Sequence, residues 1–213
     1  MIVIDMQNAF LKEGGYYEIV GKTVKGKEKL INNCKRLLQE ARKAGVRVIF
    51  VKMSLPIAIF QNNLPRVLQK YPELSNIVAK DPLQIRRGFY LEGEWGSEII
   101  DELKPVQGDL VISKHSYDAF EGTNLDFLLR QFNIRVCIFV GIFANVCVAT
   151  SVFHAYCLGY EPVLVKDAVR CYQGDEYFLL PFLKNFQRHF GMVTKTSDLL
   201  KKLRSYKTET QEL

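Results

Sequence analysis

Three side chains with the chemistry of a nucleophilic site follow apolar, strand-like runs of this chain. They are Asp5, Lys114 and Cys147. A carboxylate can accept the proton of a thiol, and a lysine stabilises the thiolate that results. Backbone N–H groups at the turn before the cysteine can hold an oxyanion. The three residue types together therefore predict covalent catalysis by a cysteine.

Each of these residues also has a plainer interpretation. Most free cysteines are small buried hydrophobic residues, Asp5 could cap a turn together with Asn8, and Lys114 could mark the exit of a strand to solvent. The position of Cys147 favours chemistry, because it precedes a helix predicted at 148–158. Unpaired N–H groups and the helix dipole favour thiolate there. We therefore expect a lowered pKa for the Cys147 thiol.

The elements that must position these side chains alternate between strands and helices. Apolar runs predict strands at 2–5, 46–51, 109–113, 135–140, 161–166 and 192–194, and amphipathic patterns predict helices at 22–44, 97–103, 123–132, 148–158, 175–190 and 196–205. This alternation predicts an α/β fold, a Rossmann-like three-layer sandwich with a parallel sheet between helices on both faces. Parallel strands end at one edge of the sheet, where ligands bind.

Residues 54–96 interrupt this alternation. We expect them to be irregular, with one helical turn at 64–69, because four prolines lie between 54 and 82. Connectors of this length are typical of lids and interfaces. The stretch is also apolar, with Leu55, Ile57, Ile59, Phe60 and Leu64. Apolar side chains in an irregular segment need cover, which predicts a homo-oligomer, either a dimer or a tetramer.

The composition limits the class of protein. A length of 213 residues with 48% hydrophobic content suits one domain, which we place at 1–205 with a polar tail at 206–213. The net charge of +6 is spread out, and we expect neither nucleic-acid nor membrane binding. Neither phosphate-binding glycine motif occurs. Five cysteines without a CxxC pair or an export signal predict free thiols in a reducing cytoplasm.

Three segments give the chain a resemblance to the isochorismatase-like cysteine hydrolases. They are Val3 to Asn8, Ser113 to Thr123 and Gly141 to Ala155, and they keep the order that the family has. The family includes nicotinamidases, carbamoylsarcosine amidase, ureidoacrylate amidohydrolase and biuret hydrolase. The resemblance implies a six-stranded parallel sheet with the strand order 3-2-1-4-5-6.

The same resemblance assigns roles within the site. It implies that Asp5, Lys114 and Cys147 form a catalytic triad. It also implies a cis peptide bond between Ile142 and Phe143, and an oxyanion hole made by the backbone N–H groups of Phe143 and Cys147. No cofactor is expected. Candidate substrate-binding residues are Gln7, Phe10, Arg87, Trp95, Tyr117 and Gln173.

Departures from the family pattern bear on the substrate. Isochorismatases proper cleave a vinyl ether and lack the cysteine. Nicotinamidases bind a metal through one Asp and two His after the second strand, whereas this chain has Lys52 to Pro56 there and no histidine before His115. We therefore expect no metal. A phenylalanine, Phe143, stands where relatives often have a small residue, which should narrow or reshape the pocket.

Other histidines and cysteines carry less weight. His154 lies too far along its helix to act as the base for Cys147, and we interpret it as a buried structural histidine. His115 should point away from the side of the strand that carries Lys114. Cys137 and Cys157 lie within predicted elements and are interpreted as core residues.

The sequence thus predicts a metal-independent cysteine amidohydrolase that acts through a covalent thioester-type intermediate. By analogy with the family, the segments at 93–98 and 114–117 favour a small ureido or carbamoyl substrate. Two alternatives remain: a nicotinamidase-type amidase, or a non-catalytic domain that keeps the fold for assembly. The presence of all three triad residues argues against the second alternative.

Overall fold

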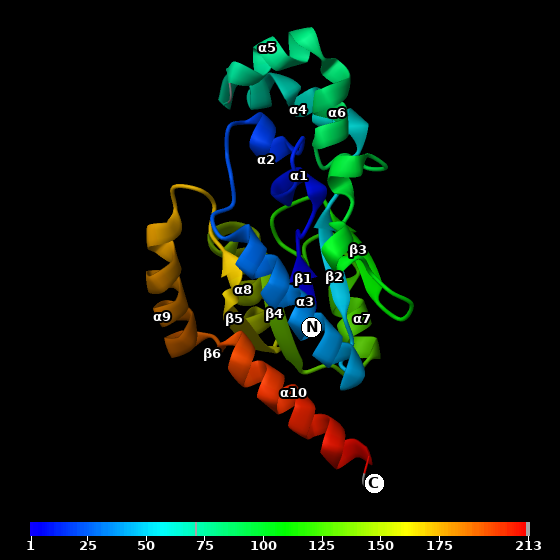
Figure 1. Cartoon of the computed structure of the whole chain (residues 1–213), viewed down its shortest axis with the longest axis vertical. Helices are drawn as coiled ribbons and strands as arrows, with labels where there is room; N and C mark the ends of the chain where they lie inside the picture. Colours follow the sequence, from blue (N-terminus) through cyan, green and yellow to red (C-terminus); the bar gives the residue numbers. More distant parts are fainter. Residues whose placement is uncertain (71, 212–213) are drawn as a thin grey trace.

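The computed structural model, which describes residues 1–70 and 72–211, is organised around a parallel six-stranded sheet (Figure 1). The strand order is β3-β2-β1-β4-β5-β6, which confirms the predicted order. The strands are β1 (Ile2–Ile4), β2 (Ile49–Met53), β3 (Leu110–Lys114), β4 (Val136–Ile142), β5 (Glu161–Arg170) and β6 (Met192–Thr194). The central strands β1 and β4 are buried on both faces, as expected for a parallel sheet.

Alternate residues of the central strands face two separate cores, so helices cover both faces of the sheet. Val3 and Val140 belong to one core, while Ile4 and Phe139 belong to the other. The first face is covered by α3 (Lys27–Lys43) and α10 (Thr196–Gln211), and the second by α7 (Leu125–Gln131), α8 (Ala149–Cys157) and α9 (Leu179–His189) (Figure 1). The three-layer sandwich is therefore confirmed. Within the described residues, no helix combines the length and apolar character needed to cross a bilayer.

Several element boundaries differ from the prediction. The helix expected at 97–103 is replaced by two 3₁₀ turns, η1 (Trp95–Ser97) and η2 (Asp101–Leu103). The Ser97 hydroxyl donates to the Glu94 carbonyl oxygen at 2.8 Å. The last helix, α10, continues to Gln211, so the expected polar tail is helical over 206–211, and 212–213 lie outside the described residues.

The helix predicted at 175–190 begins later than expected. A 3₁₀ turn, η4 (Glu176–Phe178), precedes α9, whose first turn contains Pro181. In the first turn of a helix a proline removes no intrahelical hydrogen bond, and so it does not kink α9.

The expectation that residues 54–96 are irregular is wrong for most of this stretch, although 89–94 do form a loop. The stretch forms α4 (Ile57–Lys70), α5 (Glu73–Lys80) and α6 (Pro82–Gly88), which we call the helical cap and which lies beyond α1 (Asn8–Leu11) and α2 (Tyr16–Ile19) in Figure 1. Three of the prolines stand at helix starts, where proline is favoured, rather than breaking the helices. They are Pro56, Pro72 and Pro82.

The two ends of the helical cap are joined at its base. Leu55 and Leu91 form an isolated parallel bridge. The Leu55 N–H donates to the Tyr90 carbonyl at 2.9 Å, and the Glu92 N–H donates to the Leu55 carbonyl at 2.9 Å. The cap therefore leaves and rejoins the body of the protein at one place.

Gly141 allows β4 to approach β1 closely just before the site. It pairs with Ile4, has a φ of 116°, and a Cβ there would lie 2.1 Å from the Ile4 carbonyl oxygen. Only glycine fits both the backbone conformation and the space. The close approach places the end of β4 beside the residue that follows β1, which is Asp5.

Replacing Gly141 by alanine should destabilise the fold by about 3–5 kcal/mol, because steric overlap with β1 adds to backbone strain. Gly108→Ala is the matched control: Gly108 also has a positive φ, 95°, but a Cβ there meets nothing within 4 Å. It should cost only about 1–2 kcal/mol. Urea unfolding of both variants measures the difference, and equal losses would contradict the steric argument.

Candidate active site

A buried ion pair lies where β1 and β3 end. Lys114 Nζ is 2.9 Å from Asp5 Oδ2, and the two side chains are 0% and 2% exposed. The remaining polar capacity is used as well: the Met53 N–H donates to Asp5 Oδ1 at 3.0 Å, and Lys114 Nζ donates to the Ser116 carbonyl at 3.0 Å. Full hydrogen bonding is what makes such a buried pair tolerable.

The backbone of Asp5 turns sharply to aim its carboxylate at this edge of the sheet. Its φ is 51°, in the left-handed region that non-glycine residues seldom adopt. Its N–H still donates to the Val51 carbonyl at 2.9 Å, and its own carbonyl accepts the Gln7 N–H at 2.8 Å. Strain of this kind costs about 1–3 kcal/mol and is found at functional sites.

Cys147 lies in a π-helical turn, η3 (Ala144–Val148), between β4 and α8. The peptide bond between Ile142 and Phe143, just before this turn, is cis, at the position implied by the family resemblance. The Phe143 carbonyl accepts the N–H groups of Val146 and Val148, both at 3.0 Å. The Cys147 N–H lies in the first turn, where N–H groups lack intrahelical partners. It can serve as a donor to a bound oxygen atom.

Ser151, which the sequence analysis did not identify, anchors the turn that carries Cys147. Its hydroxyl donates to the Cys147 carbonyl at 2.6 Å and accepts the Ala119 N–H at 2.9 Å. Ala119 belongs to the loop after β3, so the segments that carry Lys114 and Cys147 are joined directly. Ser151 is buried, and it supports the site without lining the cavity.

The electrostatics of the three side chains differ from the expectation. Burial, reinforced by the negative charge of Asp5, raises the pKa of the Cys147 thiol, and the opposing effect of Lys114 is smaller. The expected lowering of this pKa is therefore wrong, because the sequence did not show how deeply the thiol is buried. Burial lowers the pKa of Lys114, but Asp5 and Cys147 outweigh it and raise the pKa overall. Burial therefore favours the neutral form of the Cys147 thiol beside the Asp5–Lys114 ion pair.

Three of the other cysteines also have a raised pKa. Burial raises the pKa of Cys34 and Cys137 to about 12 and that of Cys171 to about 11. Cys157, expected in the core, is exposed near the end of α8. Solvent access alone would make it the first thiol to react with an added reagent.

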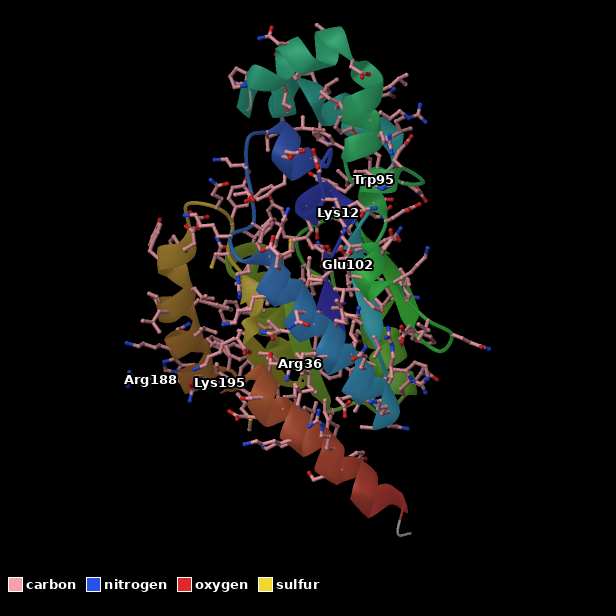
Figure 2. The ribbon with its side chains drawn as sticks, viewed as in Figure 1. Lys12, Arg36, Trp95, Glu102, Arg188 and Lys195 are labelled. Carbon is pink, nitrogen blue, oxygen red and sulfur yellow. The ribbon has the colours of Figure 1, made fainter. Side chains whose placement is uncertain are left out.

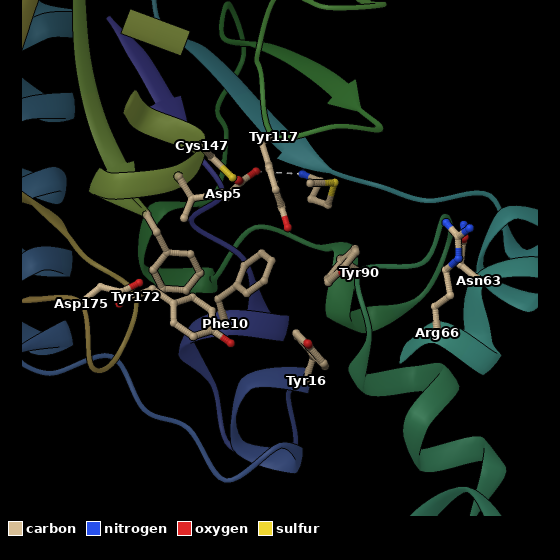
Figure 3. Close-up of a pocket in the computed structure, with 13 residues that line it drawn as sticks. Asp5, Phe10, Tyr16, Asn63, Arg66, Tyr90, Tyr117, Cys147, Tyr172 and Asp175 are labelled. Atoms are coloured by element: carbon tan, nitrogen blue, oxygen red, sulfur yellow. Dashed lines mark hydrogen bonds between the residues drawn. The ribbon is translucent and has the colours of Figure 1, made fainter. Parts of the chain in front are cut away.

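A cavity of about 430 Å³ opens over Asp5 and Cys147 (Figure 3). Its volume falls within the range of roughly 300–1,000 Å³ that is usual for ligand sites. Six aromatic rings and three further polar side chains line it: Phe10, Tyr16, Tyr90, Tyr117, Phe143 and Tyr172, with Asn63, Arg66 and Asp175. The dashed line in Figure 3 marks the bond from Met53 to the Asp5 carboxylate at the cavity floor.

Only some of the predicted substrate-binding residues line the cavity. Phe10 and Tyr117 line the cavity. Gln7 does not: its Nε2 donates to the carbonyls of Met53 and Ser97 at 2.7 and 3.0 Å, and its Oε1 accepts the Met53 N–H at 2.8 Å. Its carboxamide therefore supports the segment beside Asp5 rather than binding a ligand.

The other three predicted substrate-binding residues lie elsewhere in this chain. Arg87 and Trp95 line a separate hollow, with the Arg87 guanidinium 5.4 Å from the Trp95 ring. Figure 2 shows Trp95 on the outside of the molecule, near the base of the helical cap. Gln173 uses its Oε1 to accept the Thr23 N–H at 2.6 Å. These positions correct the sequence-based expectation.

The sequence analysis missed other residues that line the cavity. Tyr172 and Asp175 follow β5, so the strand-end rule that identified Asp5 could have found them. Asn145 holds their loop: its Nδ2 donates to Asp175 Oδ2 at 2.8 Å, and its Oδ1 accepts the Tyr172 N–H at 3.0 Å. Tyr90 and Arg66 carried no such signal, because the helical cap brings them to the cavity.

Neither His154 nor His115 lines the cavity. His154 is half-buried rather than buried, and its Nδ1 lies 2.7 Å from Asp118 Oδ2. Nδ1 of His115 is 2.6 Å from the Ser54 carbonyl. Among the described residues, no group of three or more His, Cys, Asp or Glu side chains is placed to hold a metal ion.

Comparison with known proteins gives consistent matches over most of the chain. The model of the isochorismatase domain matches residues 1–198. Ureidoacrylate amidohydrolase RutB of Agrobacterium fabrum is 33% identical over 210 residues, which cover 93% of this chain and 86% of that protein. RutB of Caulobacter segnis is 35% identical over 200 residues, which cover 93% of this chain and 82% of that protein.

Solved structures show the same fold. A cysteine hydrolase from Pseudomonas syringae pv. phaseolicola has a TM-score of 0.77 at 24% identity, with 96% of this chain and 92% of that chain covered. The N-carbamoylsarcosine amidase from Thermoplasma acidophilum has a TM-score of 0.62 at 25% identity, with 92% and 94% covered.

The raised pKa of Cys147 predicts slow alkylation that accelerates with pH. Because the folded site holds the thiol protonated, the thiolate fraction at any pH is lower than for an ordinary thiol, whose pKa is about 8.5. In Cys157→Ser protein, the rate of iodoacetamide labelling at Cys147 should still rise through about pH 9. Peptide mapping by mass spectrometry follows the rate. A plateau that begins below about pH 7 would show a thiolate already formed.

Proposed function

The chain belongs to the isochorismatase family, and we propose that it is a cysteine amidohydrolase that cleaves a C–N bond of a small ureido or carbamoyl compound. The observation that carries this proposal is the buried Asp5–Lys114 pair beside Cys147 at the floor of an open cavity. The names of its relatives, ureidoacrylate amidohydrolase and N-carbamoylsarcosine amidase, support the choice of substrate.

In the proposed reaction, Asp5 first takes the proton of Cys147. The transfer converts a carboxylate and a thiol into a carboxylic acid and a thiolate, so the net charge of the site does not change. This matters because burial and the Asp5 charge are what oppose ionisation of the thiol. When Asp5 is neutralised, the thiolate retains the positive charge of Lys114 beside it. Internal transfer therefore avoids the main obstacle to forming the nucleophile.

The thiolate then attacks the carbonyl carbon of the substrate. A C–S bond forms, and the electron pair of the C=O bond moves to oxygen. We assign the binding of the oxyanion to the backbone N–H groups of Phe143 and Cys147. Phe143 directly precedes the π turn, and Cys147 lies within it. Donors aimed at the developing charge are worth about 2.7–4 kcal/mol each in comparable enzymes.

Collapse of this intermediate breaks the C–N bond. Asp5 returns its proton to the departing nitrogen, which leaves as ammonia or an amine, and the acyl group stays on Cys147 as a thioester-type intermediate. Asp5, again a carboxylate, accepts a proton from water, whose oxygen attacks the same carbon. The C–S bond breaks and the thiolate regains its proton. We propose that no metal takes part, because the triad supplies the base, the cation and the nucleophile.

Three further properties belong to this proposal. We propose a single domain that includes residues 1–205, since Leu199, Leu200 and Leu203 of α10 belong to the main core. The five free cysteines support a cytoplasmic location. Exposed apolar side chains support a homo-oligomer, either a dimer or a tetramer.

The triad assignment predicts the effect of three substitutions on ammonia release from a panel of ureides, carbamoyl compounds and nicotinamide. Cys147→Ala should abolish activity, since the nucleophile is lost. Asp5→Asn, which keeps the shape of the side chain, should lower kcat by at least about a hundredfold. Cys157→Ala is the matched control on the next helix and should keep full activity.

The same panel distinguishes the alternatives. Activity should persist after exhaustive chelation and should favour ureides over nicotinamide. Preference for nicotinamide, or loss on chelation with recovery on adding Zn²⁺, would support the nicotinamidase alternative. Activity in Cys147→Ala protein equal to that of the unsubstituted chain would refute the triad.

The proposed assembly predicts a dimer or tetramer at micromolar concentration. Ile57 and Ile59 on the helical cap are each 41% exposed, and Tyr177 and Leu180 near the start of α9 are 69% and 60% exposed. Apolar surface of this kind is commonly buried between subunits. Sedimentation velocity measures the mass, and a strict monomer would contradict the prediction.

A further inference from the structure

We propose that Arg66, presented by the helical cap, binds an anionic group of the substrate, and that a planar part of the substrate lies between this group and the amide at Cys147. The inference rests on the proposed function, since it assigns the two ends of one bound ureide. It follows from the distribution of charges around the cavity, from its aromatic wall and from the way in which α4 holds Arg66.

The charged side chains that line the cavity are unevenly placed. Asp5 lines the cavity, but its charge is compensated by Lys114 at 2.9 Å. Asp175 is a second carboxylate, and its Oδ2 accepts a hydrogen bond from the neutral amide of Asn145 at 2.8 Å. Among the described residues that line the cavity, Arg66 is the one that carries a permanent positive charge. An anionic group is therefore repelled near Asp175 and attracted near Arg66, which fixes the direction of the substrate.

Aromatic rings line the cavity between the thiol and Arg66. The rings of Phe10 and Tyr90 are stacked, with centroids 5.5 Å apart and planes inclined by 26°. Phe143, next to the proposed oxyanion hole, meets Phe10 edge-on at 5.7 Å. Figure 3 shows Tyr90 between Cys147 and Arg66. A continuous aromatic surface favours a flat, conjugated or apolar group over a hydrated chain.

The helix that carries Arg66, α4, is anchored by a buried aromatic side chain. Phe60 on this helix is buried and packs edge-on against Phe89, with ring centroids 4.9 Å apart. Asn63 and Arg66 stand three residues apart, so they share one face of the helix, and both line the cavity. The buried face of α4 is thus held by the body of the protein, while its other face presents the Arg66 guanidinium to the ligand. Arginine suits a carboxylate because its donors form a planar fork.

The experiment compares ureidoacrylate, which carries a carboxylate, with its uncharged methyl ester. Arg66→Gln should raise KM for the acid about tenfold and leave kcat within about twofold, because one charge-assisted contact to an exposed side chain is lost. KM for the ester should not change. Arg66→Lys should give a KM for the acid that lies between those of Arg66→Gln and the unsubstituted enzyme.

Arg86→Gln is the matched control. Arg86 also lies on the helical cap, but it pairs with Glu94 and does not line this cavity. It should leave KM for both compounds unchanged. An equal rise in KM for the acid and for the ester in Arg66→Gln would overturn the assignment. A rise in KM for the acid alone in Arg86→Gln would also overturn it. So would a preference of the unsubstituted enzyme for the ester.

Binding without turnover separates this inference from the proposed function. Calorimetry on Cys147→Ala protein, with and without Arg66→Gln, measures the dissociation constant for the acid directly. We expect about a tenfold weakening on loss of Arg66. If the acid binds in this way but no ureide is hydrolysed, the proposed reaction fails and the Arg66 site stands. If ureides are hydrolysed but Arg66→Gln does not alter binding of the acid, only the inference fails.

Discussion

The buried ion pair between Asp5 and Lys114 is the interaction on which the rest of the site depends. Two charges withdrawn from water are costly unless every polar atom around them is satisfied. Here the Met53 N–H, the Ser116 carbonyl and the pair itself meet that need. The exposed pair of Lys12 and Glu102, visible in Figure 2, lies at a similarly short distance but in contact with solvent, so it contributes little. Burial also raises the pKa of the neighbouring Cys147 thiol, and the negative charge of Asp5 acts in the same direction.

Much of the body of the protein could be predicted from the sequence, because apolar strands and amphipathic helices leave periodic signals. The strand-end rule placed Asp5, Lys114 and Cys147 at one edge, and the structure has them there. The helical cap could not be predicted in the same way, since prolines that start helices resemble prolines that end them. For the same reason, Tyr90 and Arg66 could not be predicted to line the cavity. Gln7 was misassigned because its motif lies beside the site, although its amide is fully used by backbone partners.

The charge state of Cys147 shows a different limit. A position at the start of a helix argues for a thiolate, and that argument is sound for a thiol in contact with water. The depth of the site reverses it, because desolvation is the largest influence on the Cys147 pKa and the nearby carboxylate acts in the same direction. Cys147 belongs to the core between the sheet and α7, α8 and α9, and its depth there is a tertiary feature.

The single attachment point of the helical cap, at the bridge between Leu55 and Leu91, has a consequence for evolution. A segment that leaves and rejoins the body at one place can lengthen, shorten or change its side chains while the strand ends below it stay as they are. Asp5, Lys114 and Cys147 lie at strand ends and at the turn before α8, whereas Arg66 lies on the helical cap and Tyr90 on the segment that follows it. The reaction can therefore be inherited unchanged while the compounds that it acts upon change. The two can evolve at different rates in one lineage.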